Sequence, residues 1–302
     1  MRVGLYLLNQ KGYTVLNDLI SAFSYEIISF VVSDFDKGLE NDYFEEIKLT
    51  CFNNNIKFYN RVDISDYSGL YSDYIFAVGW RWLIKSSSNL IVLHDSILPK
   101  YRGFSPLVNM LINGEKRIGV TALKASYEYD KGDIIFKKSI EISYPIKIQS
   151  AIDLILPLYS DIILKICSQL YEKKELFLIK QLESEASYSL WRDEIDYLID
   201  WSYDSNDIKR FCDSVGFPYK GASAYINSKK VRILDVEVYC DVIIENRKNN
   251  IGKIIFMNAG FPIIVCSSGL LKIKQIISDD DSQSLIGKLN FRTRFTSVKL
   301  DN

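Results

Sequence analysis

The stretch LIVLHDSILPKYRG, residues 90–103, decides how the N-terminal half of the chain folds. Its first four residues are apolar, which is typical of an inner strand of a parallel sheet. His94 follows directly, and the residues after it, with Pro99 and Gly103 among them, cannot continue the strand. Open α/β sheets bind ligands at the carboxyl ends of their strands. We therefore expect His94, the single histidine of the chain, to lie at a ligand-binding edge.

Short apolar runs alternate with helical patterns on both sides of this stretch. Strands are predicted over about 3–8, 27–33, 74–78, 90–93, 118–125 and 134–142, and helices over about 14–23, 40–54, 105–113 and 149–173. This alternation favours βαβ units, so we expect a Rossmann-like α/β domain with a parallel sheet over residues 1–180. Residues 9–12 lack the spaced glycines of a dinucleotide-binding loop, so neither NAD nor FAD is expected.

The pattern changes after residue 180. A charged segment over 181–200 is predicted to be a linker, and a short helix is predicted over 205–215. Several strands separated by turn residues follow: SAYINS, KVRILDVEVY, GKIIFMN, FPIIVCSS and LLKIKQIIS. Short strands at this spacing favour a small β-barrel of the OB type. We therefore expect a smaller, OB-like β domain over residues 201–302.

The composition is that of a globular protein, with 48% hydrophobic and 25% charged residues among 302. Its 37 basic and 38 acidic side chains leave no positive excess for binding nucleic acid, which disfavours such a partner unless a local basic patch exists. Five scattered cysteines without a CxxC pair are typical of a reducing compartment, and with one histidine they make a metal site improbable. Charged residues interrupt the longest apolar stretch, 151–167, so we expect a cytoplasmic protein that does not bind membranes.

Asp130 is the second residue with a candidate chemical role. It lies in the segment YEYDKGD, residues 127–133, between two predicted strands. Turn chemistry alone explains an aspartate and a glycine there, and a lone histidine is more often structural than catalytic. A carboxylate can also orient an imidazole and stabilise its protonated form. The residues by themselves leave a structural and a catalytic interpretation open.

Together the two segments resemble the signatures of the formyltetrahydrofolate-dependent formyltransferases. Residues 94–103, HDSILPKYRG, are similar to the family's HxSLLPxYRG, and residues 130–133, DKGD, are similar to its D-x-G-[DP]. Their separation also matches the family's usual spacing. Further similarity at 113–114, 119–121, 199–201 and 218–222 extends the resemblance over most of the chain. The family includes methionyl-tRNA, glycinamide ribonucleotide and sugar-amine formyltransferases.

The resemblance implies an enzyme that moves the formyl group of N10-formyltetrahydrofolate to a primary amine, without a metal. It implies catalytic roles for His94 and Asp130. The folate would bind along Gly79, Trp80, Arg81, Trp82, Leu83, Tyr127, Asp130 and Asp133. The amine substrate would contact Ser96, Lys100, Tyr101, Arg102 and Gly103. From the residues alone, Trp80 and Trp82 fit a pair of core or rim aromatics equally well.

The expected acceptor is a small amine on a nucleotide-linked sugar, in a setting such as lipopolysaccharide O-antigen biosynthesis. Lys100 and Arg102 would then face its phosphates. A methionyl-tRNA formyltransferase is the alternative, which the nearly neutral chain disfavours because such an enzyme must bind a polyanion. A weakly active or noncatalytic homologue that binds folate or a nucleotide sugar is a further alternative. The protein could also form a homodimer.

Val92 departs from the family pattern, which usually has asparagine two residues before the histidine. An amide there can donate a hydrogen bond to the oxygen that becomes negative as the amine attacks, and loss of one such donor costs about 3 kcal/mol. Three interpretations follow. His94 or a backbone amide carries the charge alone, which we favour; another amide such as Asn109 or Asn113 enters the site; or the site binds without turnover.

Overall fold

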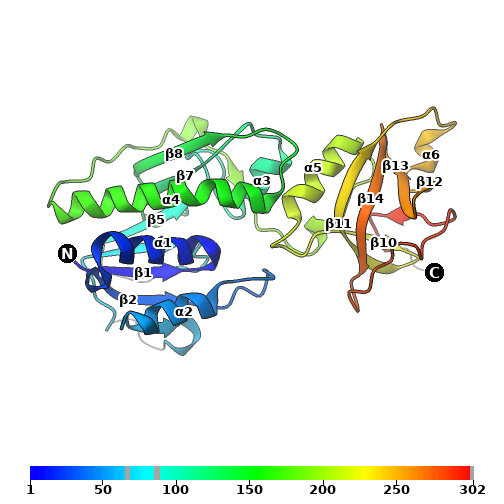
Figure 1. Ribbon diagram of the computed structural model, residues 1–302. Coiled ribbons are helices and arrows are strands. Elements are labelled where there is room, and N and C mark those ends of the chain that lie inside the picture. Colours follow the sequence, from blue (N-terminus) through cyan, green and yellow to red (C-terminus); the bar gives the residue numbers. More distant parts are fainter. Residues whose placement is uncertain (65–68, 85–88, 300–302) are drawn as a thin grey trace. The chain divides into compact units, whose positions relative to one another are not determined.

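Figure 1 shows the computed structural model of the protein, which describes residues 1–64, 69–84 and 89–299. The chain forms two compact units. The first contains residues 1–107, 116–142 and 151–190, and the second contains residues 108–115, 143–150 and those from 191 onward. Within the described ranges, every helix is too short or too polar to cross a membrane.

A seven-stranded sheet forms the centre of the first unit, in the order β3-β2-β1-β4-β5-β7-β8. The strands are β1 (Val3–Leu7), β2 (Ile28–Ser33), β3 (Phe58–Asn60), β4 (Tyr74–Val78), β5 (Asn89–His94), β7 (Arg117–Lys124) and β8 (Ile134–Glu141). The first five pair in parallel, whereas β7 is antiparallel to β5 and β8 is antiparallel to β7. The α/β class is therefore confirmed, with a sheet that is mixed because β7 and β8 form a hairpin.

The strand order reverses between β1 and β4. From β1 the chain moves to β2 and β3 on one side, and it then returns to β4 on the other side of β1. In open α/β sheets, ligands bind in the crevice outside the carboxyl ends of the strands at such a reversal. The carboxyl ends of β1, β4 and β5 are therefore where the fold favours a site.

Three helices run alongside this sheet: α1 (Asn9–Phe23), α2 (Phe44–Asn53) and α4 (Ile148–Tyr171) (Figure 1). α1 and α4 lie side by side. Gln10 Nε2 donates to Asp153 Oδ1 at 3.3 Å, and Ser160 donates a hydrogen bond to Asp18. These contacts join α1, near the start of the chain, to α4, which comes after the last strand of the sheet.

Two helices begin at residues that differ from the predicted ones. α1 begins at Asn9 rather than near residue 14, and Gly12 permits this because a Cβ there would lie 2.8 Å from the Cβ of Leu7. α2 begins at Phe44 rather than near residue 40, since Asp42 Oδ1 accepts a hydrogen bond from the N–H of Phe44 at 3.0 Å. In each case a local contact sets the start.

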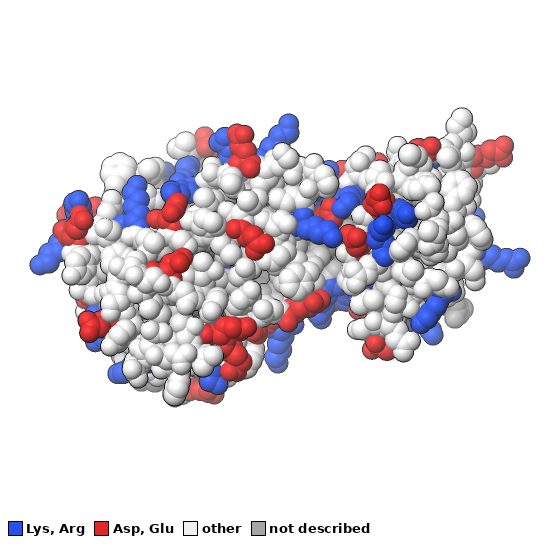
Figure 2. Space-filling view, in the orientation of Figure 1, with Lys and Arg blue, Asp and Glu red and all other residues white. Residues whose placement is uncertain are grey.

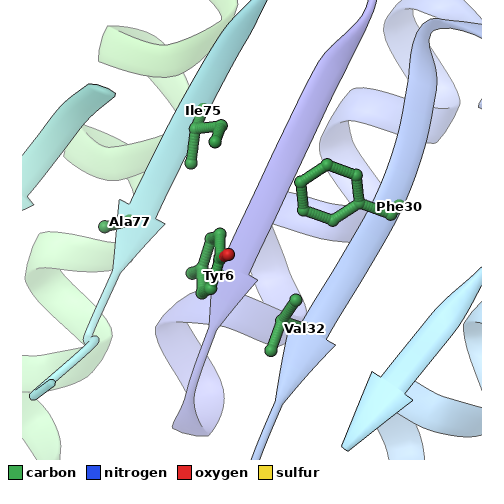
Figure 3. Packing of buried hydrophobic residues seen from close by; sticks show 5 residues of the cluster. All are labelled: Tyr6, Phe30, Val32, Ile75 and Ala77. Carbon is green, nitrogen blue, oxygen red and sulfur yellow. The ribbon is translucent and has the colours of Figure 1, made fainter. Parts of the chain in front are cut away.

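One cluster of buried side chains fixes the central strands against each other (Figure 3). It contains Tyr6 from β1, Phe30 and Val32 from β2, and Ile75 and Ala77 from β4, each at most 3% exposed. Alternate residues of each strand point to the same face of the sheet, which brings these side chains together. The rings of Tyr6 and Phe30 meet edge to face, with centroids 6.1 Å apart. Full burial of such a side chain contributes about 1.5–3 kcal/mol.

A small parallel sheet lies next to the main one. It pairs β6 (Arg102–Gly103) with β9 (Tyr188–Ser189), and α3 (Pro106–Ile112) follows β6. Residues 181–190, which lie in the predicted linker, belong to the first unit. They run back along the loop that follows His94, so they contribute to the same edge of the structure.

The second unit is built around an antiparallel sheet in the order β12-β13-β14-β11-β10-β15. Its strands are β10 (Ala222–Ile226), β11 (Lys229–Tyr239), β12 (Ile254–Asn258), β13 (Phe261–Val265), β14 (Leu270–Ser278) and β15 (Phe295–Thr296), with helices α5 (Ser205–Val215) and α6 (Arg247–Asn250). Phe295 N donates to Gly252 O at 2.8 Å, and Ile254 N donates to Thr293 O at 3.2 Å. These bonds bring the two ends of the curled sheet together, which confirms the predicted barrel-like β domain.

Candidate active site

His94 is the last residue of β5, at its carboxyl end. Its side chain is 8% exposed, and Nε2 lies 2.8 Å from the carbonyl oxygen of Tyr101. A carbonyl oxygen can only accept, so Nε2 carries the hydrogen. The neutral imidazole therefore presents the lone pair of Nδ1 on its other side.

Asp130 lies on that other side. Its Oδ1 is 3.6 Å from Nδ1 of His94, and its Oδ2 accepts a hydrogen bond from the N–H of Gly103 at 2.8 Å. The carboxyl side chain is 13% exposed. The two predicted catalytic residues thus meet near the surface, although 36 positions separate them in the chain (130 − 94).

The two groups face each other through two acceptor atoms. With the hydrogen on Nε2 directed at Tyr101, the Nδ1 lone pair of a neutral His94 faces a carboxylate oxygen. A proton placed between Nδ1 and Oδ1 is attracted by both groups, and a carboxylate stabilises the imidazolium that results. Chemically, the pair can accept a proton from a group that binds beside it and hold it there.

The segment 96–100 shapes the loop after His94. Ser96 is completely buried, and its hydroxyl donates to the carbonyl oxygen of Lys100 at 2.7 Å. Thr121 Oγ1 donates to the carbonyl oxygen of Ser96 at 2.6 Å. Among the predicted substrate contacts, the Ser96 side chain therefore closes a turn inside the protein, whereas Lys100 is exposed.

Arg102 is also completely buried. Its Nη1 donates to Glu183 at 2.9 Å and to the hydroxyl of Tyr188 at 3.1 Å, while Nε and Nη2 donate to Gln181. The guanidinium group is fully used within the protein and does not face solvent. We therefore leave Arg102 out of the proposed substrate contacts.

Gly103 binds Asp130 through its main chain and requires glycine. Its φ is +99°, and a Cβ would lie 2.5 Å from the carbonyl oxygen of Ser189. Tyr101 is partly exposed and holds His94 through its carbonyl oxygen. The KYRG segment thus supports His94 and Asp130 mainly through backbone groups.

Arginines and aspartates meet at the carboxyl ends of β2, β3 and β4. Arg81 forms an ion pair with Asp36, whose side chain is 1% exposed, and Arg61 Nε contacts Asp34 at 2.5 Å. The Arg61 guanidinium also lies over the ring of Trp82, 4.1 Å from its centroid. Two of the predicted folate contacts are therefore engaged within the protein. Arg81 is paired with Asp36, and Arg61 covers one face of the Trp82 ring.

The aromatic residues of the predicted folate loops divide into two kinds. Trp80 packs on the core, with its ring centroid 5.0 Å from that of Tyr6 and 5.1 Å from that of Trp82. Trp82, Leu83 and Tyr127 are 36%, 72% and 108% exposed, so their apolar surfaces are accessible to a ligand. The core interpretation fits Trp80, and the ligand interpretation fits Trp82.

Gly79 and Asp133, the remaining predicted folate contacts in these loops, act through their backbone conformation and main-chain hydrogen bonds. Gly79 has a φ of +64°, and a Cβ there would lie 2.9 Å from Nδ2 of Asn9. It lets the loop after β4 pass close to the start of α1. Asp133 is half-buried, and its carbonyl oxygen accepts a hydrogen bond from the N–H of Lys124 at 2.9 Å. Both residues shape the loops on which the exposed side chains sit.

Val92 lies two residues before His94 on β5, so both side chains point to the same face. It is half-buried and packs against the cluster of Leu98, Leu123 and Ile134. The position of the family's usual asparagine is therefore an apolar contact here. Asn109, which the sequence analysis offered as a substitute amide, belongs to the second unit.

Sequence reasoning missed a buried cluster around Asp95. Lys11 from α1 pairs with Asp95, and the hydroxyl of Tyr159 from α4 donates to the same carboxylate. Lys11 is 7% exposed and Tyr159 is 0% exposed. The three residues come from distant parts of the chain, and the only signal was a charged residue directly after His94.

The structure gives little support for a nucleophilic cysteine or a metal site within the described residues. Burial raises the pKa of the Cys51, Cys167 and Cys266 thiols to about 12, so these thiols are not nucleophiles at neutral pH. Across residues 1–64, 69–84 and 89–299, no three His, Cys, Asp or Glu side chains gather to hold a metal ion. On the face drawn in Figure 2, basic and acidic side chains are interspersed.

Two family models match the chain. The model described as formyl transferase covers residues 63–150, which include His94 and Asp130. The model described as formyl transferase, C-terminal domain, covers residues 193–285. The chain belongs to the formyl transferase family. Along the chain of this formyl transferase, the first matched region precedes the second.

Two curated relatives of this formyl transferase carry different names. The bifunctional polymyxin resistance protein ArnA of Wigglesworthia glossinidia brevipalpis is 31% identical over 77% of this chain and 37% of its own length. Methionyl-tRNA formyltransferase of Halothermothrix orenii is 33% identical over 62% of this chain and 59% of its own length. The matched region is thus well short of the full length of either relative.

A solved structure has the same fold. It is an N-formyltransferase from Helicobacter canadensis in complex with folinic acid and dTDP-3-aminofucose. It superposes with a TM-score of 0.68, covering 90% of this formyl transferase and 98% of that chain, at 17% sequence identity. At this identity the likeness establishes the fold alone.

Proposed function

We propose that this formyl transferase moves the formyl group of N10-formyltetrahydrofolate to a primary amine, with His94 and Asp130 as catalytic residues. The observation that carries the proposal is the pair of Nδ1 and Oδ1 atoms, 3.6 Å apart at the carboxyl end of β5. The pair lies inside the matched formyl transferase region. Strand ends of this kind are where α/β sheets bind ligands.

The chemistry needs a group that accepts a proton. An amine that attacks a formyl carbon must lose a proton as the new carbon–nitrogen bond forms. Nδ1 of His94 can take this proton, and Asp130 stabilises the resulting imidazolium. Tyr101 keeps the ring in place because its carbonyl oxygen holds the N–H at Nε2. A proton held there can later pass to the nitrogen that leaves.

Exposed side chains on the loops after β4 and β7 suit a folate. Trp82, Leu83 and Tyr127 expose large apolar surfaces that are costly to leave in water. An aromatic donor molecule would cover them, and when bound it supplies the formyl carbon. The folinic acid in the Helicobacter canadensis structure supports a folate for this fold. No metal takes part in the proposed reaction.

For the acceptor we propose an amine on a nucleotide-linked sugar. Lys100 is exposed in the loop that follows His94 and can contact a phosphate. The formal charge of -1 and the interspersed charges in Figure 2 do not favour a large polyanion. The dTDP-3-aminofucose in the Helicobacter canadensis structure is an example of the proposed class.

A methionyl-tRNA acceptor is the second candidate. Two observations favour it: residues 193–285 match the C-terminal formyl transferase domain, and curated relatives are named as methionyl-tRNA formyltransferases. Such an enzyme should need charged tRNA, and added salt should sharply reduce its activity. An enzyme for a small amino sugar should keep its activity at moderate salt.

Mass spectrometry tests the proposal directly. The protein is incubated with N10-formyltetrahydrofolate and a panel of nucleotide-linked amino sugars, and each product is searched for the mass increase of one formyl group. We expect product with wild type and at least a hundredfold less with His94→Asn or Asp130→Ala, roughly the effect of losing a general base. Equal amounts of product from all three proteins would refute the assignment of His94 and Asp130 as catalytic residues.

Two further arms separate the alternatives. Methionyl-tRNA replaces the sugars in one, and the amine is omitted in the other. Product only with tRNA would support the second candidate. Formate released without an amine would indicate a hydrolase, and folate binding without either product would indicate a noncatalytic protein.

A further inference from the structure

Gln181 contacts the loops that hold both catalytic residues, although it lies far along the chain. Its Oε1 accepts hydrogen bonds from Nε and Nη2 of Arg102, at 3.0 and 2.9 Å. Its Nε2 donates to the carbonyl oxygens of Asp130 and Gly132, both at 2.7 Å. A guanidinium group only donates and a carbonyl only accepts, so the amide has a single possible orientation. Both ends of the side chain are fully used.

Arg102 lies between the two backbone groups that hold the catalytic pair. The carbonyl oxygen of the residue before it accepts the hydrogen bond from His94. The N–H of the residue after it donates to Asp130 Oδ2. Because Arg102 is completely buried, this segment cannot shift unless the guanidinium group moves with it. The contacts of that guanidinium therefore bear on both catalytic side chains.

The backbone of Asp130 needs support. Its φ is +55°, in the left-handed region, which aspartate adopts more readily than most residues with a side chain but still at a cost in free energy. Such a conformation persists only where the surrounding structure holds it. Gln181 provides two hydrogen bonds there, one of them to the carbonyl oxygen of Asp130 itself. Without them the loop is free to relax, and the carboxylate moves with it.

We propose that Gln181 is a positioning residue of the formyl-transfer reaction. Together with Arg102 it closes a ring of contacts that sets the distance between Nδ1 of His94 and Oδ1 of Asp130. This inference rests on the proposed function of that site. A displacement of about 1 Å at a reacting group can lower a rate by roughly a hundredfold, so a residue outside the reaction centre can control it.

Gln181→Glu is the sharpest test. The new side chain keeps an oxygen for Arg102, but it turns a second oxygen towards the two carbonyl groups and cannot donate to them when ionised. We expect kcat to fall by about tenfold to a hundredfold, while KM for both substrates stays within about twofold. Gln275→Glu makes the same charge change at an exposed position of β14 and should behave as wild type.

The single histidine gives a second readout. In protein without a histidine tag, the imidazole signal in the NMR spectrum belongs to His94 alone. Wild type should carry its hydrogen on Nε2 when neutral. In Gln181→Glu and Gln181→Met the tautomer or the midpoint of the pH titration should change, whereas a loss of general stability would leave both as they are.

The outcomes are distinct. The inference is overturned if kcat and the His94 titration both stay at wild-type values, or if kcat falls while the His94 signal is unchanged. Gln181→Met tests the same contacts without a charge, and Gln181→Glu decides alone if the methionine variant does not fold. If wild type forms no product, the proposed function fails, and the NMR comparison still tests whether Gln181 positions the pair.

Discussion

The hydroxyl group of Tyr159 donates a hydrogen bond to the carboxylate of Asp95. Burial, followed by the nearby charge of Asp95, raises the pKa of Tyr159 well above its usual value, so the phenol keeps its proton and remains a donor. Tyr159→Phe removes this donor and little else. We expect the free energy of unfolding, measured in urea, to fall by about 1.5–3 kcal/mol, as for hydrogen bonds to charged groups.

Tyr171→Phe is the matched control. Tyr171 ends the same helix and is 64% exposed, so the loss of its hydroxyl should leave the free energy of unfolding nearly unchanged. Equal effects of the two substitutions would mean that the contact between Tyr159 and Asp95 does not contribute to stability.

The outline of the fold could be predicted from periodicity. The strands at 3–8, 27–33 and 74–78 are buried throughout or almost throughout, and apolar runs of that kind carry a strong signal. β3 was missed because Phe58–Asn60 is only three residues long and half-buried. Short edge strands leave no pattern of their own, since their pairing depends on a neighbour elsewhere in the chain.

The site could be predicted only in part, for a similar reason. His94 and Asp130 stand in recognisable segments, and the structure brings them together. Arg102 looked like an exposed phosphate contact because its loop is polar. The residues that bury it, such as Gln181 and Tyr188, come some 80 positions later and have no sequence feature that points back to it.

Val92→Asn tests the missing amide. The new side chain would stand two residues before His94 on the same face of β5, where an amide can donate to a developing negative charge. We expect kcat to rise, by up to about a hundredfold. The free energy of unfolding should fall by about 1–3 kcal/mol, because Val92 packs against Leu98 and Leu123.

Leu90→Asn separates the two effects. Leu90 is also half-buried and points to the same face of β5, but it lies two residues further from His94 than Val92 does. It should lose a similar amount of stability without a gain in kcat. A lower kcat in well-folded Val92→Asn protein would show that the site is built around an apolar neighbour.

Trp82→Ala tests the proposed folate surface. Arg61 covers one face of the indole, so a bound aromatic group would meet the exposed remainder of the ring. Aromatic contacts of this kind contribute about 0.5–1.5 kcal/mol, so KM for the folate should rise by about twofold to tenfold with kcat nearly unchanged. Steady-state kinetics with varied folate measures both.

Tyr71→Ala is the control for this prediction. Tyr71 is 73% exposed and precedes β4, at the opposite end of the strand from Trp82. Its removal should leave KM for the folate unchanged. A similar rise in both variants would place the folate elsewhere or indicate a general loss of structure.

Asp213 should make stability depend on pH. Burial, the largest cause, raises the pKa of this carboxyl group in the folded protein, against the opposing effect of Lys209. Its contribution is fully present below the pKa of the unfolded chain and is lost as pH rises through the folded-state pKa. In urea unfolding between about pH 4 and about pH 7, Asp213→Asn should therefore gain stability relative to wild type as pH rises.

Asp241→Asn should show the opposite slope. A hydrogen bond from Arg247 is the largest of the causes that lower the pKa of Asp241, so its contribution is present above the unfolded-state pKa and is lost as pH falls. Between about pH 2 and about pH 4, below the pKa of the unfolded chain, this variant should lose stability relative to wild type as pH rises. Two variants with the same slope would contradict the assignment, because each removes one carboxylate from the same unit and only the environments of the two groups differ.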